Sequence, residues 1–310
     1  MTRQTVRIAT RKSPLALWQA GFVRARLQEI HPGLEVTLLP LSTRGDKILD
    51  APLAKVGGKA LFVKELEQAL IDSEADIAVH STKDLPVDLP EGLELAVILQ
   101  RQDPRDGLVS NYYDDIRSLP QQARVGTSSV RRQCQLLKLR PDLNLLDLRG
   151  NVGTRLAKLD AGEFDAIVLA CAGLQRMELE SRIRQRIDPK LMVPAIAQGA
   201  ISIECRADDD DVRRLITPLD DADSHICIRA ERAFNRRLMG GCQVPIGGYA
   251  EVHGSELRLR GMVGRPDGTE LIYGEQRDST RGAERLGTTL AEDILARGAG
   301  QILKDYYASV

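Results

Sequence analysis

One cysteine of this 310-residue chain, Cys242, stands in a segment that suits a thiol with a chemical role. Two glycines precede it, two more follow within six residues, and Pro245 fixes one backbone angle, so we expect neither helix nor strand around it. A lone cysteine in a tight turn is most often an inert apolar side chain. The rest of the chain favours the alternative, a shaped loop that presents the sulfur for bonding.

Arginines gather where predicted strands lead into helices. Residues 125–132 read as strand, turn and helix start, so Thr127, Ser128 and Ser129 can cap the helix while its free N–H groups face an anion. Two arginines in that first turn oppose the helix dipole, which costs stability unless an anion is bound. Residues 148–155 repeat the pattern. The arginines at such junctions are Arg11, Arg131, Arg132, Arg149, Arg155 and Arg176.

A solvated surface charge is the ordinary interpretation of any one of these arginines. Six at equivalent junctions predict instead a cleft for a ligand with several carboxylates or phosphates, because α/β folds bind ligands beyond the ends of their strands. No glycine-rich phosphate loop of the GxGxxG or GxxxxGK[ST] type occurs. Lys and Arg total 43 against 44 Asp and Glu, and aromatic residues are only 4%, so neither charge nor stacking surface points to nucleic acid.

Asp84 is the acid that stands out among these cations. It follows Lys83 after a predicted strand and precedes a Leu-Pro pair, which places it at the mouth of the first lobe. Neighbouring cations would keep its carboxylate ionised, and a negative group in a cationic cleft suits a reaction that passes through a cation. Capping of a turn is an alternative that the spacing favours about equally.

Other site chemistry finds little support in the sequence. The five cysteines are widely spaced without a CxxC pair and there are only four histidines, so we expect neither a disulfide framework nor a metal site. The acidic run at 208–211 lacks a calcium-loop pattern and is interpreted as a turn or helix start. The N-terminus lacks the apolar stretch of a signal peptide, and no segment is apolar enough to span a membrane, so we expect a cytoplasmic protein.

Strand and helix patterns alternate through the first two thirds of the chain, which predicts two α/β lobes followed by a small α+β domain. Predicted strands lie at 6–9, 36–41, 77–79, 124–126, 143–148, 166–169, 200–204, 256–262 and 270–276. Predicted helices lie at 14–30, 61–71, 129–139, 152–160, 224–239 and from 281 onward.

Six segments in chain order strongly resemble the porphobilinogen deaminase family, also called hydroxymethylbilane synthases. They are residues 11–16, 55–59, 80–86, 126–132, 148–151 and 241–245. The resemblance covers nearly the whole chain, with little signal beyond about residue 251. Ala60 stands where many relatives have glycine, which affects only the expected local loop geometry.

The resemblance implies a transferase of porphyrin (haem) biosynthesis that joins four porphobilinogen molecules head to tail into linear hydroxymethylbilane and releases ammonia. It implies a dipyrromethane cofactor held by a thioether to Cys242, and Asp84 as the catalytic acid that stabilises the azafulvene cation. Each pyrrole carries an acetate and a propionate, which accounts for the arginines. By resemblance the cofactor contacts are Lys83, Asp84, Ser129, Arg132 and Arg155. The substrate contacts implied are Arg11, Ser13, Phe62, Arg131, Arg149, Arg155, Arg176 and Gln198.

The family's fold implies three domains, two lobes like type II periplasmic binding proteins and a C-terminal domain with the cofactor loop. We expect the first lobe at 1–99 and 200–217, the second at 105–194, and the α+β domain at 222–310. The resemblance also implies a monomer without nucleic-acid or membrane partners.

Two other functions remain open at the level of sequence. A two-lobed protein that binds a polycarboxylate without catalysis would explain the arginines but predicts a secretory signal and leaves Cys242 unexplained. A cysteine acyltransferase with His225 or His253 as base would need Cys242 as a nucleophile that turns over.

Overall fold

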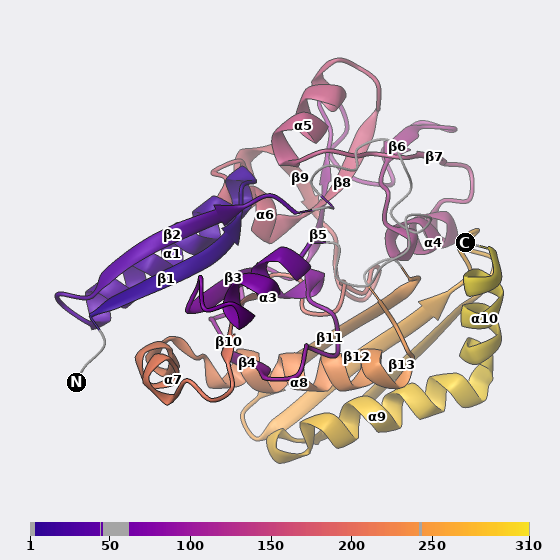
Figure 1. Cartoon of the computed structure of the whole chain (residues 1–310). Coiled ribbons are helices and arrows are strands. Elements are labelled where there is room, and N and C mark those ends of the chain that lie inside the picture. Colours follow the sequence, from indigo (N-terminus) through magenta and orange to yellow (C-terminus); the bar gives the residue numbers. More distant parts are fainter. Residues whose placement is uncertain (1–3, 44, 46–61, 242–243, 310) are drawn as a thin grey trace. The chain divides into compact units, whose positions relative to one another are not determined.

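The computed structural model of the protein describes residues 4–43, 45, 62–241 and 244–309 (Figure 1). The chain divides into two compact units. The first unit comprises Met1–Gln102 and Ala200–His225, and the second comprises Asp103–Gly199 and Ile226–Val310. In the described part of the chain, no helix combines the length and apolar character needed to cross a membrane.

The first unit is built on a five-stranded sheet with the strand order β2-β1-β3-β10-β4. Strands β1, β2 and β3 run parallel, whereas β10 pairs antiparallel with both β3 and β4. The elements are β1 (Thr5–Arg11), α1 (Pro14–Ile30), β2 (Glu35–Leu41), α3 (Lys64–Ile71), β3 (Ile77–Ser81), β4 (Leu93–Ile98), β10 (Ile201–Arg206) and α7 (Asp210–Ile216). The chain passes from β1 to β2 on one side and then to β3 on the other, so a topological switch point lies where β1 and β3 end.

Helix α1 begins where the sequence places its signals. Ser13 is the N-cap, with its Oγ accepting from the Ala16 N–H at 3.3 Å, and Pro14 occupies the first turn. Its inner face, which includes Val23 and Leu27, is buried against the apolar side chains of β1 and β3. Packing of this face therefore orients the residues at the ends of both strands.

The second unit repeats this topology in a sheet with the order β7-β6-β8-β5-β9. Strands β6, β7 and β8 are parallel, and β5 pairs antiparallel with β8 and β9. The elements are β5 (Asp106–Val109), β6 (Arg124–Gly126), α4 (Val130–Leu139), β7 (Asn144–Leu146), α5 (Val152–Asp160), β8 (Ala166–Ala170), α6 (Cys171–Arg176) and β9 (Ile183–Arg186). The switch point of this sheet lies where β6 and β8 end.

The second unit also contains a three-stranded antiparallel sheet covered by helices α8 and α9 on one face. Its other face packs through Met262 on Cys134 of α4 and on Val193. The elements are α8 (Ala222–Arg237), β11 (Ile246–His253), β12 (Glu256–Gly264), β13 (Leu271–Ser279), α9 (Ala283–Ile294) and α10 (Gly300–Ser309). The C-terminal sheet and the preceding α/β sheet thus share buried contacts.

The predicted helices at 14–30 and 152–160 and the strand at 124–126 are confirmed at both ends. The acidic run at 208–211 begins α7, capped by Asp209 Oδ1 accepting from the Val212 N–H at 3.1 Å. Four strands were not predicted from the sequence, namely β4, β5, β9 and β11, and the last three have an atypical composition. Strand β5 opens on a buried aspartate, β9 reads Ile-Arg-Gln-Arg, and β11 carries two glycines in its first three residues.

The two α/β sheets and the C-terminal α+β portion agree with the predicted fold class. The three domain boundaries stay a prediction, because compactness groups the second α/β sheet and the C-terminal sheet into one unit.

One buried acid sets a pH dependence of stability in the first unit. Glu67 lies on the inner face of α3 and is 5% exposed. Burial, followed by the charge of Glu204, raises the pKa of Glu67 to about 7, although His80 and Lys64 act in the opposite direction. The folded protein therefore holds this proton to a higher pH than the unfolded chain does.

Because the folded pKa of Glu67 is raised, its contribution to stability is complete below the ordinary carboxyl range and is lost as pH rises toward 7. We expect Glu67→Gln to remove this loss, leaving the variant more stable than wild type near neutral pH by roughly 2–3 kcal/mol. Urea unfolding across this pH range measures the difference. Glu74→Gln, which changes an exposed carboxylate after α3, is the matched control, and equal slopes in wild type and Glu67→Gln would contradict the prediction.

Candidate active site

The first unit places several predicted site residues at the carboxyl edge of its parallel strands. Arg11 is the last residue of β1, and its guanidinium carbon lies 4.3 Å from the centre of the Phe62 ring. Ser13, two residues on, is committed by its side chain to capping α1. The edge thus presents a cation held over an aromatic face, an arrangement that restrains a guanidinium without removing its charge.

Lys83 and Asp84 lie on a 3₁₀ turn, Thr82–Asp84, directly after β3. The turn is held because the Thr82 N–H donates to the Ala200 carbonyl at 3.1 Å and the Leu85 N–H donates to the Thr82 carbonyl at 3.2 Å. Both Lys83 and Asp84 are half-buried. Arg11 at the end of β1 and Asp84 just after β3 therefore lie at the ends of the two adjacent strands that flank the switch point.

A further polar pair at this edge was missed by the sequence analysis. Gln19 of α1 is buried, and its Nε2 donates to Ser81 Oγ at 2.9 Å. The signal was present, because a glutamine occupied an inward position in the helical pattern. The pair joins the first helix to the end of β3.

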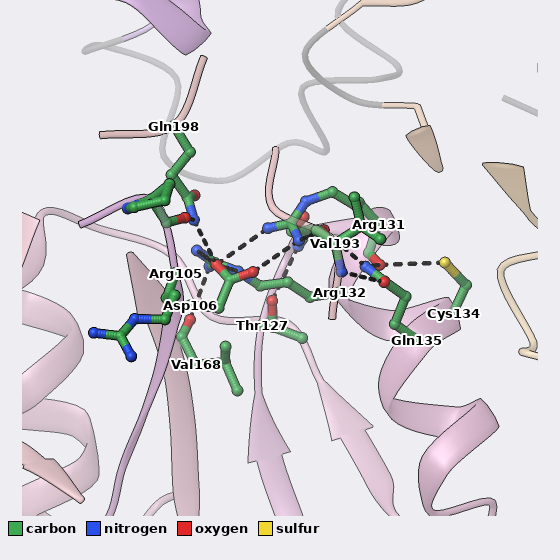
Figure 2. A network of polar contacts seen from close by, with 12 residues as sticks. Arg105, Asp106, Thr127, Arg131, Arg132, Cys134, Gln135, Val168, Val193 and Gln198 are labelled. Atoms are coloured by element: carbon green, nitrogen blue, oxygen red, sulfur yellow. Dashed lines mark hydrogen bonds and ion pairs between the residues drawn. The ribbon is translucent and has the colours of Figure 1, made fainter. Parts of the chain in front are cut away.

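In the second unit, Arg131, Arg132 and Gln198 converge on one buried carboxylate, Asp106 (Figure 2). Arg131 Nη1 donates to Asp106 Oδ2 at 2.7 Å, Arg132 Nη2 lies 2.8 Å from Oδ1, and Gln198 Nε2 donates to Oδ1 at 3.0 Å. Carbonyls of β8 and of the segment before Gln198 accept further bonds, from Arg132 to Val168 and from Arg131 to Val193. None of the four converging side chains is in a residue more than 6% exposed.

The electrostatics of this cluster follow from two guanidinium groups sharing one acid. Burial would raise the pKa of Asp106, but the charges of Arg131 and Arg132 and the bonds from Arg131 and Gln198 lower it well below its usual range. Burial lowers the pKa of Arg132, against the opposing effect of Asp106. The three charged side chains together carry one excess positive charge in a desolvated place.

Asp106 corrects the expectation about the first turn of α4. The anion that the structure places against the two arginines is a carboxylate of the same chain, which no local pattern could reveal because it lies 25 residues away from Arg131. Ser129 does not cap α4 with its side chain. Ser128 also has another role, because its Oγ donates to the Leu148 carbonyl at 2.7 Å and joins two adjacent loops.

The other predicted site arginines of the second unit, Arg149, Arg155 and Arg176, are each oriented by an oxygen of the same unit. Arg149 Nε lies 2.6 Å from Asp147 Oδ2, and Arg155 Nε donates to the Gly150 carbonyl at 2.7 Å. Arg176 ends α6 and donates to the Gly199 carbonyl at 2.6 Å, beside Gln198. Burial lowers the pKa of Arg176 to about 10, so it remains charged at neutral pH.

The segment that carries Gln198 is positioned by Glu231 of α8. One oxygen of this buried carboxylate accepts from the Ala197 N–H at 2.6 Å and the other from the Ala250 N–H at 2.8 Å. Ala197 has a φ of 60°, a conformation uncommon for residues other than glycine. The carboxylate therefore stabilises a strained residue next to a predicted site residue.

Cys242 lies outside the described residues, but the residues that lead to it are described. Helix α8 ends in a Schellman motif in which the Gly240 N–H donates to the Asn235 carbonyl at 2.9 Å and the Met239 N–H to the Arg236 carbonyl at 3.0 Å. Met239 has a φ of 53°, and its carbonyl accepts from the Tyr307 hydroxyl at 2.8 Å. The approach to Cys242 is thus held by both α8 and α10.

Two domain families match the chain in order. The dipyrromethane cofactor-binding domain of porphobilinogen deaminase matches residues 6–214, and the C-terminal domain of the same enzyme matches residues 225–296. The chain belongs to the porphobilinogen deaminase family. It is therefore a transferase of tetrapyrrole biosynthesis that condenses four porphobilinogen molecules head to tail into hydroxymethylbilane, with release of ammonia, on a covalently bound dipyrromethane primer.

Solved structures of similar fold include binding proteins of low sequence identity. A putative methionine-binding lipoprotein from Bacillus subtilis is 15% identical, over 70% of this chain and 91% of that chain, with a TM-score of 0.44. A periplasmic substrate-binding protein of an ABC transporter from Coxiella burnetii is 16% identical, over 69% of this chain and 91% of that chain, with a TM-score of 0.45.

The residues of the second unit fit a porphobilinogen deaminase cofactor that carries carboxylates. Arg131 Nε is buried and has no hydrogen-bond partner within the described part of the chain, so one N–H of the guanidinium still requires an acceptor. The excess positive charge around Asp106 likewise favours an added anion. In the described residues no group of three His, Cys, Asp or Glu side chains could hold a metal ion.

If Asp106 neutralises the buried arginines, its removal leaves two guanidinium groups without their shared acid. We expect Asp106→Asn to lower the free energy of unfolding by about 3–5 kcal/mol near neutral pH. The depressed pKa of Asp106 means that its stabilisation is present above the ordinary carboxyl range and is lost only as pH falls through its lowered folded value. Chemical denaturation measures the change.

Asp114→Asn, which neutralises an exposed carboxylate of the same unit, should leave the unfolding curve nearly unchanged. Equal stability of Asp106→Asn and wild type at neutral pH would show that the arginines do not depend on this acid.

Proposed function

We propose that Asp84 is the catalytic acid of this porphobilinogen deaminase and that it acts at the switch point between β1 and β3. The observation that carries the proposal is its place on the turn after β3, beside the strand that ends in Arg11. An ionised carboxylate there stabilises the positive charge that develops on the substrate as ammonia leaves. Lys83 on the same turn and Arg11 on β1 supply cations for the acetate and propionate of that substrate.

The second unit, in this proposal, holds the carboxylates of the cofactor and of the growing chain. The proposed cofactor contacts, which follow from the family resemblance, are Lys83, Asp84, Ser129, Arg132 and Arg155. The contacts to substrate and product chain are Arg11, Ser13, Phe62, Arg131, Arg149, Arg155, Arg176 and Gln198. Support comes from the excess charge around Asp106 and from the anchored, oriented guanidinium groups, since preorganised donors need little rearrangement when an anion arrives.

We propose Cys242 as the attachment point of dipyrromethane. When bound, this group supplies the free pyrrole carbon to which the first porphobilinogen is joined. A thioether resists hydrolysis, so a cysteine sulfur suits an anchor that must persist over many turnovers. The Schellman motif and the Tyr307 contact support this role by restraining the residues before Cys242. We also propose that the protein is a cytoplasmic monomer.

The intact mass of the purified protein tests the anchor. Wild type should be heavier than its sequence by one dipyrromethane and should colour with an aldehyde reagent for pyrroles, whereas Cys242→Ala should show neither signal. Cys227→Ala, which alters a buried cysteine of α8, should keep the added mass. An active wild-type enzyme of unmodified mass would exclude the covalent attachment.

Asp84→Asn and Arg149→Leu should fail in different ways. Asp84→Asn should retain the cofactor mass but lose about 10²–10³ in turnover, as expected for loss of a main electrostatic group. Arg149→Leu should accumulate covalent species with one or a few extra pyrroles, because the carboxylates of a later ring lack their partner. Mass spectrometry after mixing with porphobilinogen resolves the two patterns.

Arg117→Leu, at an exposed arginine of the same unit, is the control for Arg149 and should complete its product. A uniform loss of rate in Arg149→Leu without trapped species would contradict its role in elongation. Near wild-type turnover in Asp84→Asn would show that Asp84 caps a turn and is not the catalytic acid.

A further inference from the structure

A row of polar side chains lies buried beneath α3 in the first unit, and none of its members is proposed above as a cofactor or substrate contact. It comprises Glu67 of α3, His80 and Thr82 in and after β3, and Ser202 and Glu204 of β10. Each of the five is at most 5% exposed. Burial of this many polar groups opposes folding unless they are paired with one another. Groups of this kind are retained most often where they have a functional role.

The register of the sheet places these side chains on one face. Ser202 lies opposite His80, and Glu204 lies opposite Ala78, so all four positions share the face that packs against α3. His80 Nε2 is 2.9 Å from Glu204 Oε2. The ladder continues beyond β3 through the bond from the Thr82 N–H to the Ala200 carbonyl, which adds Thr82 to the same row.

Most polar atoms of the row lack a hydrogen-bond partner among the residues that the structure describes. They include Glu67 Oε1, Ser202 Oγ, Thr82 Oγ1 and both oxygens of Glu204. His80 Nε2 has ion-pair distance to Glu204 without the alignment of a hydrogen bond. Buried acceptors and hydroxyls in this state can take up and pass on protons, because each hydroxyl both donates and accepts.

One end of the row reaches the proposed active site. Thr82 begins the 3₁₀ turn that carries Asp84. Ala9 and Ala78 are in register, and by strand alternation Arg11 and His80, each two residues further on, belong to the same face of the sheet. The row therefore extends from the interior of the sheet to the edge where Asp84 and Arg11 lie.

We propose that Glu67, His80 and Glu204 form a buried proton relay that acts through Thr82 and Asp84 during each condensation. The inference rests on the proposed role of Asp84. In each step the bond from the aminomethyl carbon to nitrogen breaks and the nitrogen keeps the electron pair. A carbon–carbon bond forms, and the attacked pyrrole carbon loses a proton. The relay holds this proton until ammonia or solvent accepts it, so the sum is one new carbon–carbon bond and one ammonium ion.

The charged groups around Glu67 are consistent with a base that works near neutral pH. The charges of Glu204 and His80 act on Glu67 from the sheet, and that of Lys64 acts from its own helix. By strand alternation Arg11 of β1 and Arg206 of β10 belong to the same face of the sheet, to which β4 contributes Leu93 and Leu95. Burial and Glu204 raise the pKa of Glu67 to about 7. A base of this pKa combines a deprotonated fraction at neutral pH with a useful affinity for a proton.

The test compares kcat of holoenzymes of verified cofactor mass from about pH 5 to about pH 9. Wild-type kcat should rise with pH through about 7, where Glu67 loses its proton. Glu67→Gln keeps the size of the side chain but cannot titrate, so this rise should disappear and kcat above pH 7 should fall about 10- to 100-fold. Glu74→Gln should follow the wild-type profile.

An unchanged profile in Glu67→Gln, or a loss by the same factor at every pH with the rise retained, would overturn the relay. If Glu67→Gln fails to fold, Thr82→Val provides the second test, because it removes one hydroxyl and leaves the ionisable groups in place. Its kcat should fall about tenfold with the pH-dependent rise retained, and an unaltered kcat would overturn the route through Thr82.

Asp84→Asn separates this inference from the proposed function. If Asp84→Asn is inactive and Glu67→Gln has the wild-type profile, only the relay is wrong. If Asp84→Asn turns over at the wild-type rate, the catalytic role of Asp84 and the relay that depends on it both fail.

Discussion

The ion cluster around Asp106 is the constraint on which the second unit depends. A fully buried carboxylate is expensive by itself, and so are two buried guanidinium groups. Together their free-energy cost of burial is lower, because each supplies the charge or the hydrogen bonds that the others lack. The cluster joins strand β5, helix α4, strand β8 and the segment before Gln198. The same contacts therefore hold these segments together and fix the orientation of Arg131 and Arg132.

The cluster of two arginines and one aspartate has an excess of one positive charge. Binding of an anion would neutralise this charge, so the stability of the cluster is linked to ligand binding. A protein selected only for stability would pair each buried guanidinium with its own acid or replace both by apolar side chains. Here Arg131 retains a buried N–H without a partner in the described part of the chain. The same desolvation that makes this arrangement costly strengthens its attraction for an added carboxylate.

Both α/β sheets use one topology to assemble their site residues. In each, the first of the three parallel strands is flanked by the second and third, so the ends of the first and third parallel strands meet at a switch point. Arg11 and Asp84 follow the paired strands of the first sheet, and the starts of α4 and α6 follow those of the second. The C-terminal part of the second unit contributes in another way. The Glu231 carboxylate of α8 accepts hydrogen bonds from the N–H groups of Ala197 and Ala250, and so joins the segment before Gln198 to strand β11.

The sequence by itself determined the local features of this protein. Ser13 and Pro14 start α1, the Ser-rich run after Gly126 starts α4, and the segments 80–86 and 241–245 carry the family resemblance, because caps, turns and motifs depend on residues a few positions apart. Most helices and the central parallel strands could be predicted for the same reason. The candidate arginines could also be predicted, since their place after strands is visible in the pattern.

The tertiary structure decided what those side chains meet. Asp106 pairs with Arg131 from 25 positions away, and Glu67, His80 and Glu204 share a buried face although α3, β3 and β10 are far apart in the chain. Strands β4, β5, β9 and β11 were not predicted, and for the last three the pairing partners, rather than their own hydrophobic alternation, stabilise the strand. The burial, charge balance and pKa of a side chain depend on the residues around it in the folded protein. A sequence pattern does not contain the distances between residues that only folding brings together.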